Sequence, residues 1–368
     1  MSYDVGIVGG GIVGSAIARE VALRKGRGVV VDTDRPVGQA TWAAAGMLSP
    51  QAEAKGPGAF LDLLLQARDL YPAFVAELEE RTGIGLGYRT EGAILVAITE
   101  EDEVELEKRL HWQRELGLDL ESLTGVKARR LEPALSAKVR SALYFPGDHQ
   151  IENRLLGKAL SFAAAALGAE FRVGAAVQKV KVDPRPTLEM ADGTTIEAET
   201  IVIAAGSWSG TLLGMPRTLP VEPVHGQLMS VTAVPPVFRH IAVSPRGYVV
   251  PRSDGRIIVG TTVERIGFRP KVTPVGLQRL AGIAVEIAPF LGNLPVEAHW
   301  SGFRPGTPDG LPILGPDPDE PRVIYATGHF RNGILLGPLT GQLIAAIALG
   351  ESASVDLKPF AIDRFPRG

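Results

Sequence analysis

Cysteine is absent from all 368 residues of the chain. This absence excludes disulfides, zinc sites built on thiolates, thiol catalysis and any cofactor attached through sulfur. The chain also lacks a dense basic run, and its net charge is −3. Because binding to nucleic-acid phosphates depends mainly on Lys and Arg, this balance argues against nucleic acid as a partner.

Long hydrophobic runs are missing as well. The most apolar stretch, residues 333–350, contains several glycines together with Pro338, Thr340 and Gln342, so we expect no membrane span. A first strand that begins at Tyr3 leaves no room for a signal or transit peptide. We therefore expect a cytoplasmic protein, and 368 residues are enough for two domains.

The first 32 residues carry the strongest motif in the chain. An apolar strand is predicted at residues 3–8, a helix at 15–25 and a second strand at 29–31. Between the first strand and the helix, residues 9–14 follow the pattern G-x-G-x-x-G. This order of elements is typical of a dinucleotide-binding site, which a lone glycine string does not predict.

Each element of this motif has a physical role in holding a dinucleotide. Gly9 allows a tight turn, Gly11 lets a pyrophosphate approach the backbone, and Gly14 lets the helix pack close to the sheet. The free N–H groups and partial positive charge of the helix N-terminus favour the phosphates. Asp32, at the end of the second strand, can accept hydrogen bonds from a ribose diol.

The rest of the chain alternates between helical and strand patterns. Helical spacing of apolar residues predicts helices at 59–82, with a break or kink at Pro72, and at 101–116, 151–167, 273–291 and 334–349. Further strands are predicted at 93–98, 171–182, 200–206, 221–234, 247–251, 256–262, 297–302 and 323–326, and the 187–197 stretch is predicted to form strands around a hairpin turn at Asp192-Gly193.

These patterns predict an α/β chain of the α+β two-domain kind. Its Rossmann-like nucleotide-binding domain is expected to consist of residues 1–50, 144–220 and 302–368. Residues 51–143 and 221–301 are expected to form a substrate-binding domain on a mostly antiparallel sheet. The two domains would then be interleaved along the chain.

Five later motifs resemble a known family when they are taken in this order after the glycine string. They are AAAGML at 43–48, IVIAAGSWSG at 201–210, GYVVPR at 247–252, GFRPGTPDGLPILG at 302–315 and GHFRNGILL at 328–336. Together they resemble the D-amino-acid oxidase superfamily of FAD-dependent amine oxidases, and within it the glycine oxidases of the thiamine pathway. The resemblance covers nearly the whole chain.

The resemblance implies FAD as the cofactor and oxidation of glycine and other small amines, such as sarcosine, D-alanine and D-proline. Hydride would pass from the substrate Cα to flavin N5. The imine would hydrolyse to glyoxylate and ammonia or supply thiazole synthesis, and O2 would leave as hydrogen peroxide. Members of the family are often homotetramers. Because the chain has no cysteine and no histidine before His111, we expect FAD to be bound without a covalent link.

Four residues are candidates for the substrate site. The planar guanidinium of Arg304, expected just after a strand, can bind a carboxylate through two parallel hydrogen bonds. Tyr248 could donate a hydrogen bond to the same carboxylate, and Met47 could line the pocket. The resemblance places Arg331 at the substrate or the flavin edge. Each residue also has a structural alternative: a loop-binding arginine, a half-buried strand tyrosine or a core methionine.

A larger set of residues is expected to contact FAD. The set is Gly9, Gly11, Ile12, Val13, Gly14, Asp32, Thr33, Ala40, Thr41, Ala45, Gly46, Met47, Val177, Ala205, Gly206, His329, Phe330, Arg331, Asn332, Gly333, Ile334 and Leu335. His329 is expected to contribute its backbone. The helix that follows Asn332 would direct its N-terminus at the pyrimidine end of the flavin, where negative charge grows on reduction.

Two positions depart from the family pattern. Asp32 stands where the longer Glu is usual, and Val263 stands where a bulkier apolar residue is expected, which would widen the pocket. Three other functions stay open at this stage. They are a D-amino-acid or proline dehydrogenase that passes electrons to a quinone or a partner subunit, a non-catalytic flavin subunit, and an oxidase domain acting on modified tRNA. The acidic balance disfavours the last.

Overall fold

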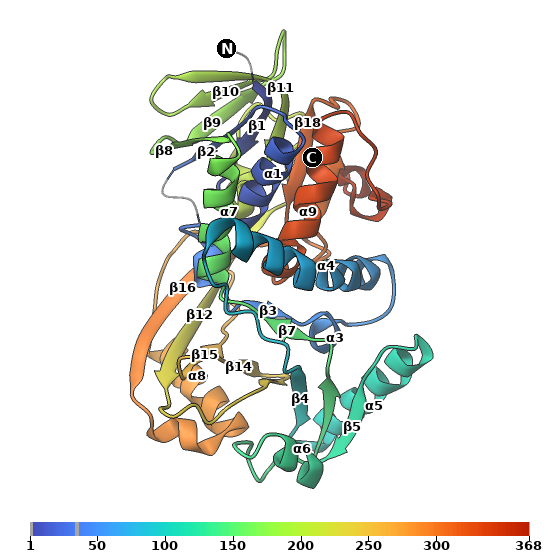
Figure 1. Cartoon of the computed structure of the whole chain (residues 1–368), viewed down its shortest axis with the longest axis vertical. Helices are drawn as coiled ribbons and strands as arrows, with labels where there is room; N and C mark the ends of the chain where they lie inside the picture. Colours follow the sequence, from blue (N-terminus) through green and yellow to red (C-terminus); the bar gives the residue numbers. More distant parts are fainter. Residues whose placement is uncertain (1–2, 34–36, 368) are drawn as a thin grey trace.

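A computed structural model of the chain describes residues 3–33 and 37–367. Within these residues the chain forms two large sheets, one above the other in Figure 1, with a long cavity between them. Helices α1, α7 and α9 cover the upper sheet, and α5, α6 and α8 lie with the lower one. None of the helices in the described residues is long and apolar enough to cross a membrane.

The upper sheet contains the N-terminal motif. Its main strands are β1 (Tyr3–Val8), β2 (Gly28–Asp32), β8 (Glu170–Val173), β11 (Thr195–Ile203), β17 (Ile313–Pro316) and β18 (Val323–Thr327). Their order is β17-β18-β11-β1-β2-β8, and β1 runs parallel to both of its neighbours, β2 and β11. The chain therefore places β2 on one side of β1 and β11 on the other. Such a change of side is a topological switch point, which opens a crevice at the carboxyl ends of the strands.

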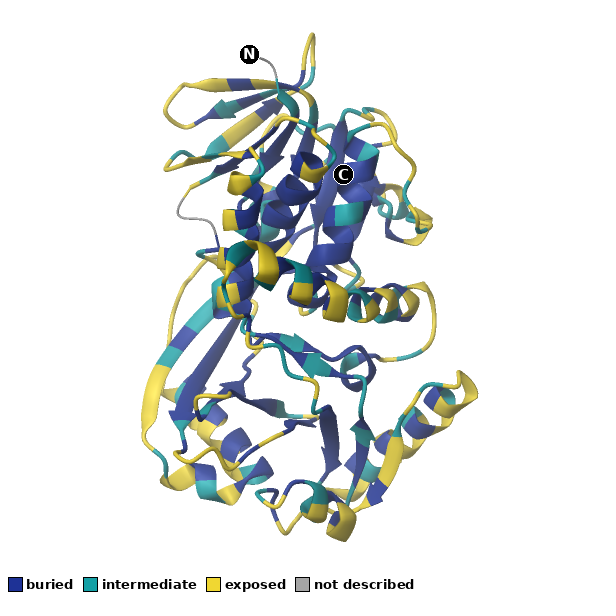
Figure 2. Cartoon of the chain, viewed as in Figure 1, coloured by how far each residue is buried: buried dark blue, intermediate teal, exposed yellow. Residues whose placement is uncertain are grey.

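Helices cover one face of this sheet because its central strands are apolar on both faces. They are α1 (Ile12–Leu23), α7 (Asn153–Ala166), α9 (Gly333–Ala348) and, across their ends, α4 (Ala59–Thr82). The other face is covered by the hairpin of β9 (Val177–Lys181) and β10 (Thr187–Met190). Figure 2 shows α1, α9 and the central strands buried, so the crevice has rigid walls.

The lower sheet is almost entirely antiparallel. Its strands are β4 (Ala93–Ala97), β5 (Glu121–Thr124), β6 (Ser141–Phe145), β12 (Glu222–Thr232), β13 (Ile241–Ser244), β14 (Gly247–Pro251), β15 (Arg256–Gly260) and β16 (Val296–Gly306). Their order is β16-β12-β15-β14-β13-β4-β6-β5, and only the described β13–β4 pair is parallel. Helices α6 (Gly125–Leu131) and α8 (Pro274–Ile287) pack on one face, and α5 (Glu100–Glu115) packs on the other.

Four short elements connect the two sheets. They are α2 (Ala40–Ala43), β3 (Met47–Leu48), α3 (Pro50–Glu53) and β7 (His149–Gln150). Strand β3 pairs with β7, so the segment after β2 is held against the chain that returns from the lower sheet. This segment forms the wall of the cavity between the sheets.

The predicted mixed α/β architecture is confirmed, and several boundaries differ from expectation. Helix α4 spans Ala59–Thr82 without a break, although Pro72 lies inside it. Pro72 removes only one backbone hydrogen bond, and the buried face of α4, which includes Tyr71 and Phe74, packs against the first core. Helix α1 begins at Ile12, three positions before the predicted 15, because its first turn uses the glycine string itself.

Three strand predictions are wrong in extent. The strand predicted at 200–206 begins at Thr195 and ends at Ile203, because it continues from the end of the 187–197 stretch as the single strand β11. The predicted strand at 171–182 is divided into β8 and β9, which belong to different parts of the upper sheet. The predicted strand at 297–302 runs on to Gly306, so Arg304 lies within β16 rather than after it, paired with Val224. Strand β16 is longer than predicted because it pairs with the long strand β12, and the sequence of β16 alone did not indicate this pairing.

The division into domains stays a prediction, although two elements bear on its boundaries. Strand β16 belongs to the lower sheet up to Gly306, beyond the predicted boundary at 302. Helix α4 was expected in the substrate-binding domain, but its apolar face packs with α7 and α9 of the upper layer. Both segments lie where the two sheets meet.

Candidate functional site

The glycine turn after β1 lies at the bottom of the cavity. Gly9 has φ of +103° and donates its N–H to the carbonyl of Val31 at 2.8 Å. A Cβ at Gly14 would lie 1.9 Å from the carbonyl oxygen of Gly9. Only glycine therefore lets the first turn of α1 pack this closely on the turn that precedes it.

Asp32 braces this turn from the neighbouring strand. Its carboxylate accepts the N–H of Gly10 at 2.6 Å and the N–H of Thr33 at 2.7 Å. Asp32 also lines the cavity, where its remaining lone pairs can accept from a bound diol. Thr41 adds a second brace, because its hydroxyl accepts the N–H of Ile12 at 3.0 Å.

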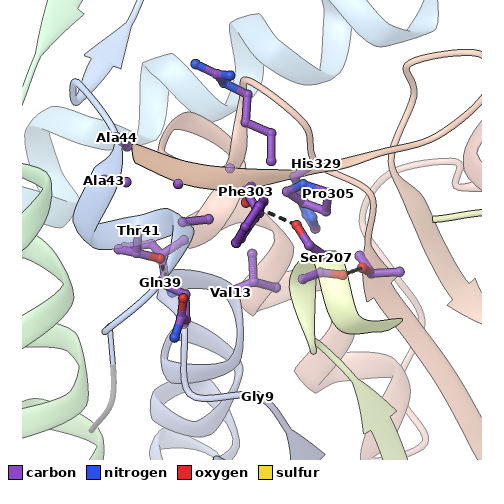
Figure 3. A pocket seen from close by; sticks show the side chains of 18 of the residues that line it. Gly9, Val13, Gln39, Thr41, Ala43, Ala44, Ser207, Phe303, Pro305 and His329 are labelled. Carbon is purple, nitrogen blue, oxygen red and sulfur yellow. Dashed lines mark hydrogen bonds between the residues drawn. The ribbon is translucent and has the colours of Figure 1, made fainter. Parts of the chain in front are cut away.

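Side chains from distant elements hold the turn at 41–46. Four of its carbonyl oxygens accept hydrogen bonds: Thr41 from Asn153 (2.6 Å), Trp42 from Arg154 (3.1 Å), Ala43 from Trp300 (3.0 Å) and Ala45 from Arg252 (2.8 Å). Residues 43–46 of this turn are all small, and Figure 3 shows Ala43 and Ala44 at the edge of the cavity. A fixed backbone with little side chain provides a flat wall for a planar ring.

Arg252 supports this wall from behind, and the sequence did not single it out. It is fully buried, and besides Ala45 it donates to the carbonyl of Ile151 at 3.0 Å. Burial lowers the pKa of its guanidinium to about 10. The available signal was an arginine directly after the apolar strand at 247–251, but that pattern does not reveal which carbonyls it binds.

Tyr248 on β14 and Arg304 on β16 face the same cavity from strands of the lower sheet that are separated by β12 and β15. Arg304 donates to the hydroxyl of Thr261 at 2.6 Å and to the carbonyl of Thr262 at 3.4 Å. Tyr248 is buried, and burial raises the pKa of its phenol, so it remains a neutral donor. Both side chains line the cavity. The two side chains that were predicted to bind a substrate carboxylate therefore face the same cavity, and their role stays a prediction.

Two glycines make the room that these side chains occupy. A Cβ at Gly226 would lie 2.1 Å from a terminal nitrogen of Arg304, and a Cβ at Gly260 would lie 2.3 Å from the ring of Tyr248. Gly226 is on β12 and Gly260 ends β15, so both lie on strands adjacent to the side chains that they accommodate. Neither glycine was predicted, because no turn or motif marks them.

Arg331 forms an ion pair with Glu53 in the wall of the same cavity. Its Nε lies 2.8 Å from one carboxylate oxygen of Glu53, and a terminal nitrogen contacts the other. Its guanidinium carbon is 6.0 Å from the ring centre of Tyr248. Burial alone would raise the pKa of Glu53, but the neighbouring guanidinium of Arg331 lowers it. Sequence analysis missed Glu53, which carries no motif.

The loop before α9 forms the opposite wall. Asn332 is the N-cap residue of α9, and Asn332, Gly333 and Ile334 line the cavity. His329 is buried and bonds through Nε2 to the hydroxyl of Thr340 at 3.1 Å. Burial lowers the pKa of His329 to about 4, so the ring is neutral and holds the loop on the helix. This arrangement supports a structural role for the histidine side chain.

Most of the predicted site residues line this one cavity. They are Gly9, Gly11, Ile12, Val13, Asp32, Thr33, Ala40, Thr41, Ala45, Gly46, Met47, Val177, Ala205, Gly206, Tyr248, Arg304, His329, Phe330, Arg331, Asn332, Gly333 and Ile334. Gly14 and Leu335 do not line it: Gly14 packs on the turn below, and Leu335 is buried in the core. The expected effect of Val263 on pocket width is not supported, because it is 49% exposed and lies outside the described lining.

Several lining residues were missed because strand β16 and the short helical turn at Gly206–Thr211 come together only in the folded chain. Figure 3 shows Ser207, Phe303 and Pro305 near His329, and the hydroxyl of Ser207 donates to the carbonyl of Phe303 at 3.0 Å. Trp208 also lines the cavity. These residues lie inside two of the motifs named above, which was the available signal.

The sequence pattern of the FAD dependent oxidoreductase family matches residues 4–347. The chain belongs to this family. FAD is thus its cofactor, as predicted, and the predicted enzyme class is confirmed. The structure fits FAD, because the cradle at Gly9 and Gly14 leaves no space for a Cβ and the cavity continues from there to Arg304.

Relatives within the FAD dependent oxidoreductases include glycine oxidases. The chain is 38% identical to a glycine oxidase of Geobacillus kaustophilus, over 98% of this chain and 97% of the relative. The crystal structure of glycine oxidase from that organism superposes with a TM-score of 0.96, at 37% identity, covering 99% of each chain. The predicted resemblance to glycine oxidases is confirmed.

A third relative is longer than this chain. The bifunctional protein ThiO/ThiG of Synechocystis is 40% identical over 98% of this chain, which spans only 54% of the relative. The matched part of that longer protein therefore corresponds to nearly the whole of this FAD dependent oxidoreductase.

Proposed function

We propose that the chain oxidises glycine, and also small amines such as sarcosine, D-alanine and D-proline, with O2 as the electron acceptor. The observation that carries this proposal is Arg304, a cavity guanidinium beside the buried phenol of Tyr248. Arg304 forms no ion pair with an acid in the described part of the chain, so it is free to pair with a substrate carboxylate. The glycine oxidase relatives support the choice of substrate.

The residues of the cavity bind and orient the substrate. Arg304 offers two parallel N–H donors to the carboxylate, and the neutral phenol of Tyr248 offers a third. Held by its carboxylate, the small substrate has little freedom to turn, so its Cα is presented reproducibly. Bound FAD supplies the two-electron acceptor for the hydride. Once the substrate amine is neutral, this chemistry requires no protein base.

The residues that would hold FAD follow from the two walls of the cavity. The N-terminus of α1 and the glycine turn would hold the pyrophosphate, and Asp32 would accept from a ribose. The turn at 41–46 would face the ring, and the first N–H groups of α9 would stabilise negative charge. With no cysteine in the chain, a thioether link is impossible, and we propose non-covalent attachment.

The overall reaction balances as glycine, O2 and water giving glyoxylate, ammonia and hydrogen peroxide. The carbon–hydrogen bond at Cα breaks, the carbon–nitrogen bond becomes an imine, and O2 takes the two electrons. We propose that the imine can also supply thiazole synthesis, which the similarity to a ThiO/ThiG protein supports. A homotetramer and a cytoplasmic location stay predictions.

The test is an anaerobic titration of the purified yellow protein with glycine, followed by air. We expect the flavin absorbance near ~450 nm to bleach and then to return as peroxide accumulates. Bleaching without return in air would favour the alternative, a D-amino-acid or proline dehydrogenase that passes electrons to a quinone or partner. No bleaching with glycine, sarcosine, D-alanine or D-proline would contradict the proposed substrates.

Replacing Gly226 with alanine provides a second check on Arg304. The new Cβ would lie 2.1 Å from the guanidinium, so the side chain must move away from its present position. Because a shift of about 1 Å in a substrate-holding group can cost about 100-fold, we expect kcat/KM for glycine to fall by about that factor. Peroxide release gives kcat/KM, and the flavin spectrum shows whether FAD is retained. A variant that keeps wild-type kcat/KM would contradict the role of Arg304.

A further inference from the structure

The charged side chains at the substrate end of the cavity leave an excess of one positive charge. Two guanidinium groups, Arg304 and Arg331, line it together with one carboxylate, Glu53, and the neutral phenol of Tyr248. Arg331 is paired with Glu53 through both carboxylate oxygens, whereas Arg304 bonds to the uncharged Thr261. One positive charge is therefore left over, and it suits one carboxylate.

The backbone that carries Glu53 is fixed by the lower layer. Asp148 accepts the N–H groups of Gln51 and Ala52, at 3.2 and 2.9 Å, at the start of α3. Arg109 donates to the carbonyl oxygens of the same two residues, at 3.0 and 2.8 Å. Because both sides of α3 are held, the carboxylate of Glu53 stays at the cavity wall, where its side chain is only 14% exposed.

We propose that Glu53 determines specificity by excluding substrates with a second anionic group. This inference rests on the proposed function. By pairing with Arg331, Glu53 removes the second guanidinium from substrate recognition. A glycine whose nitrogen bears a carboxymethyl group would then bring an unpaired negative charge beside Glu53 into a poorly solvated cavity. Binding of the second carboxylate is opposed because no guanidinium is free to pair with it and because the negative charge of Glu53 repels it.

Replacing Glu53 with an uncharged side chain of the same length tests this role directly. In Glu53→Gln, Arg331 is released and the cavity offers two guanidinium groups to the ligand. The probes are glycine and iminodiacetate, which differ by one carboxymethyl group on nitrogen. We expect the ratio of kcat/KM for iminodiacetate to that for glycine to rise by at least about tenfold. Glu53→Asp keeps the charge, so its ratio should stay near that of the wild type.

The binding of ligands that are not oxidised provides a second measurement. Acetate and malonate carry one and two carboxylates, and we expect either ligand to change the flavin spectrum of the holoenzyme when it binds beside the ring. We expect Glu53→Gln to strengthen malonate binding relative to acetate by a similar factor. The double variant Glu53→Gln with Arg331→Met should lose this gain. If Glu53→Gln fails to fold, Arg331→Met alone leaves Glu53 unpaired, and malonate should then weaken more than acetate.

The outcomes separate this inference from the proposed function. If the wild type oxidises glycine but Glu53→Gln, loaded with FAD, leaves both ratios within twofold, the role of Glu53 is overturned and the proposed function stands. If the wild type leaves glycine untouched, the proposed function fails, whereas the acetate and malonate ratio still reports on Glu53. A rise in both ratios that Arg331→Met abolishes supports the proposal.

Discussion

Replacing Arg304 with methionine is expected to lower kcat/KM for glycine by about 10³-fold while FAD stays bound. Methionine keeps much of the length and apolar stem but removes all of the N–H donors. The substrate carboxylate would then enter a cavity in which Arg331 is already paired with Glu53, so no other guanidinium of the described cavity wall replaces the lost partner. Steady-state peroxide release measures the loss.

Arg304→Lys is the matched control for this prediction. Lysine keeps the positive charge but not the planar fork, so we expect it to recover part of the activity lost in methionine. The flavin spectrum of both variants should match the wild type, because Arg304 belongs to β16 and the cradle at Gly9 belongs to the upper sheet. A methionine variant within tenfold of the wild type would show that the carboxylate binds elsewhere.

Replacing Gly14 with alanine is expected to weaken FAD binding by about 100-fold or more. The added Cβ would lie 1.9 Å from the carbonyl of Gly9, and a backbone atom cannot rotate away as a side chain can. The turn and the first turn of α1 must separate, and overpacking of this kind costs about 1–3 kcal/mol before any loss of the pyrophosphate cradle. Gel filtration followed by the ratio of flavin to protein absorbance measures retained FAD.

Gly282→Ala provides a control for the general effect of adding a methyl group. Gly282 lies inside α8, and apart from its chain neighbours and the nearby backbone of the helix itself, no described atom lies within 4 Å of its added Cβ. Because alanine favours a helix over glycine by about 1 kcal/mol, this variant should keep FAD and unfold at the same or a higher temperature. Full retention of FAD by Gly14→Ala after gel filtration would refute the role of the close contact.

The nucleotide-binding end of the cavity could be predicted because its parts are consecutive in the chain. Strand β1, the glycine turn, α1 and β2 lie within residues 3–32, and the close contact between Gly14 and Gly9 is local. Periodicity and glycine positions report such short-range geometry directly. The later motifs identified the family because their order is specific, even where their contacts were unknown.

The substrate end was only partly predictable. Arg304 and Tyr248 could be proposed from their chemistry and from the motifs around them. That Gly226 and Gly260 leave space for them was not predictable, because it depends on which strands are neighbours in the lower sheet. The extension of β16 to Gly306 has the same cause, since it follows from its pairing with β12.

By itself, then, the sequence determined the nucleotide motif, the mixed fold, the family and the two residues most suited to hold a carboxylate. The tertiary structure alone decided which charged side chains of the cavity pair with each other. Glu53 and Arg331 are 278 positions apart, and neither has a periodic or local signal that links it to the other. Whether a guanidinium is free to bind substrate depends on which acid lies beside it, and only the folded chain brings that acid into contact.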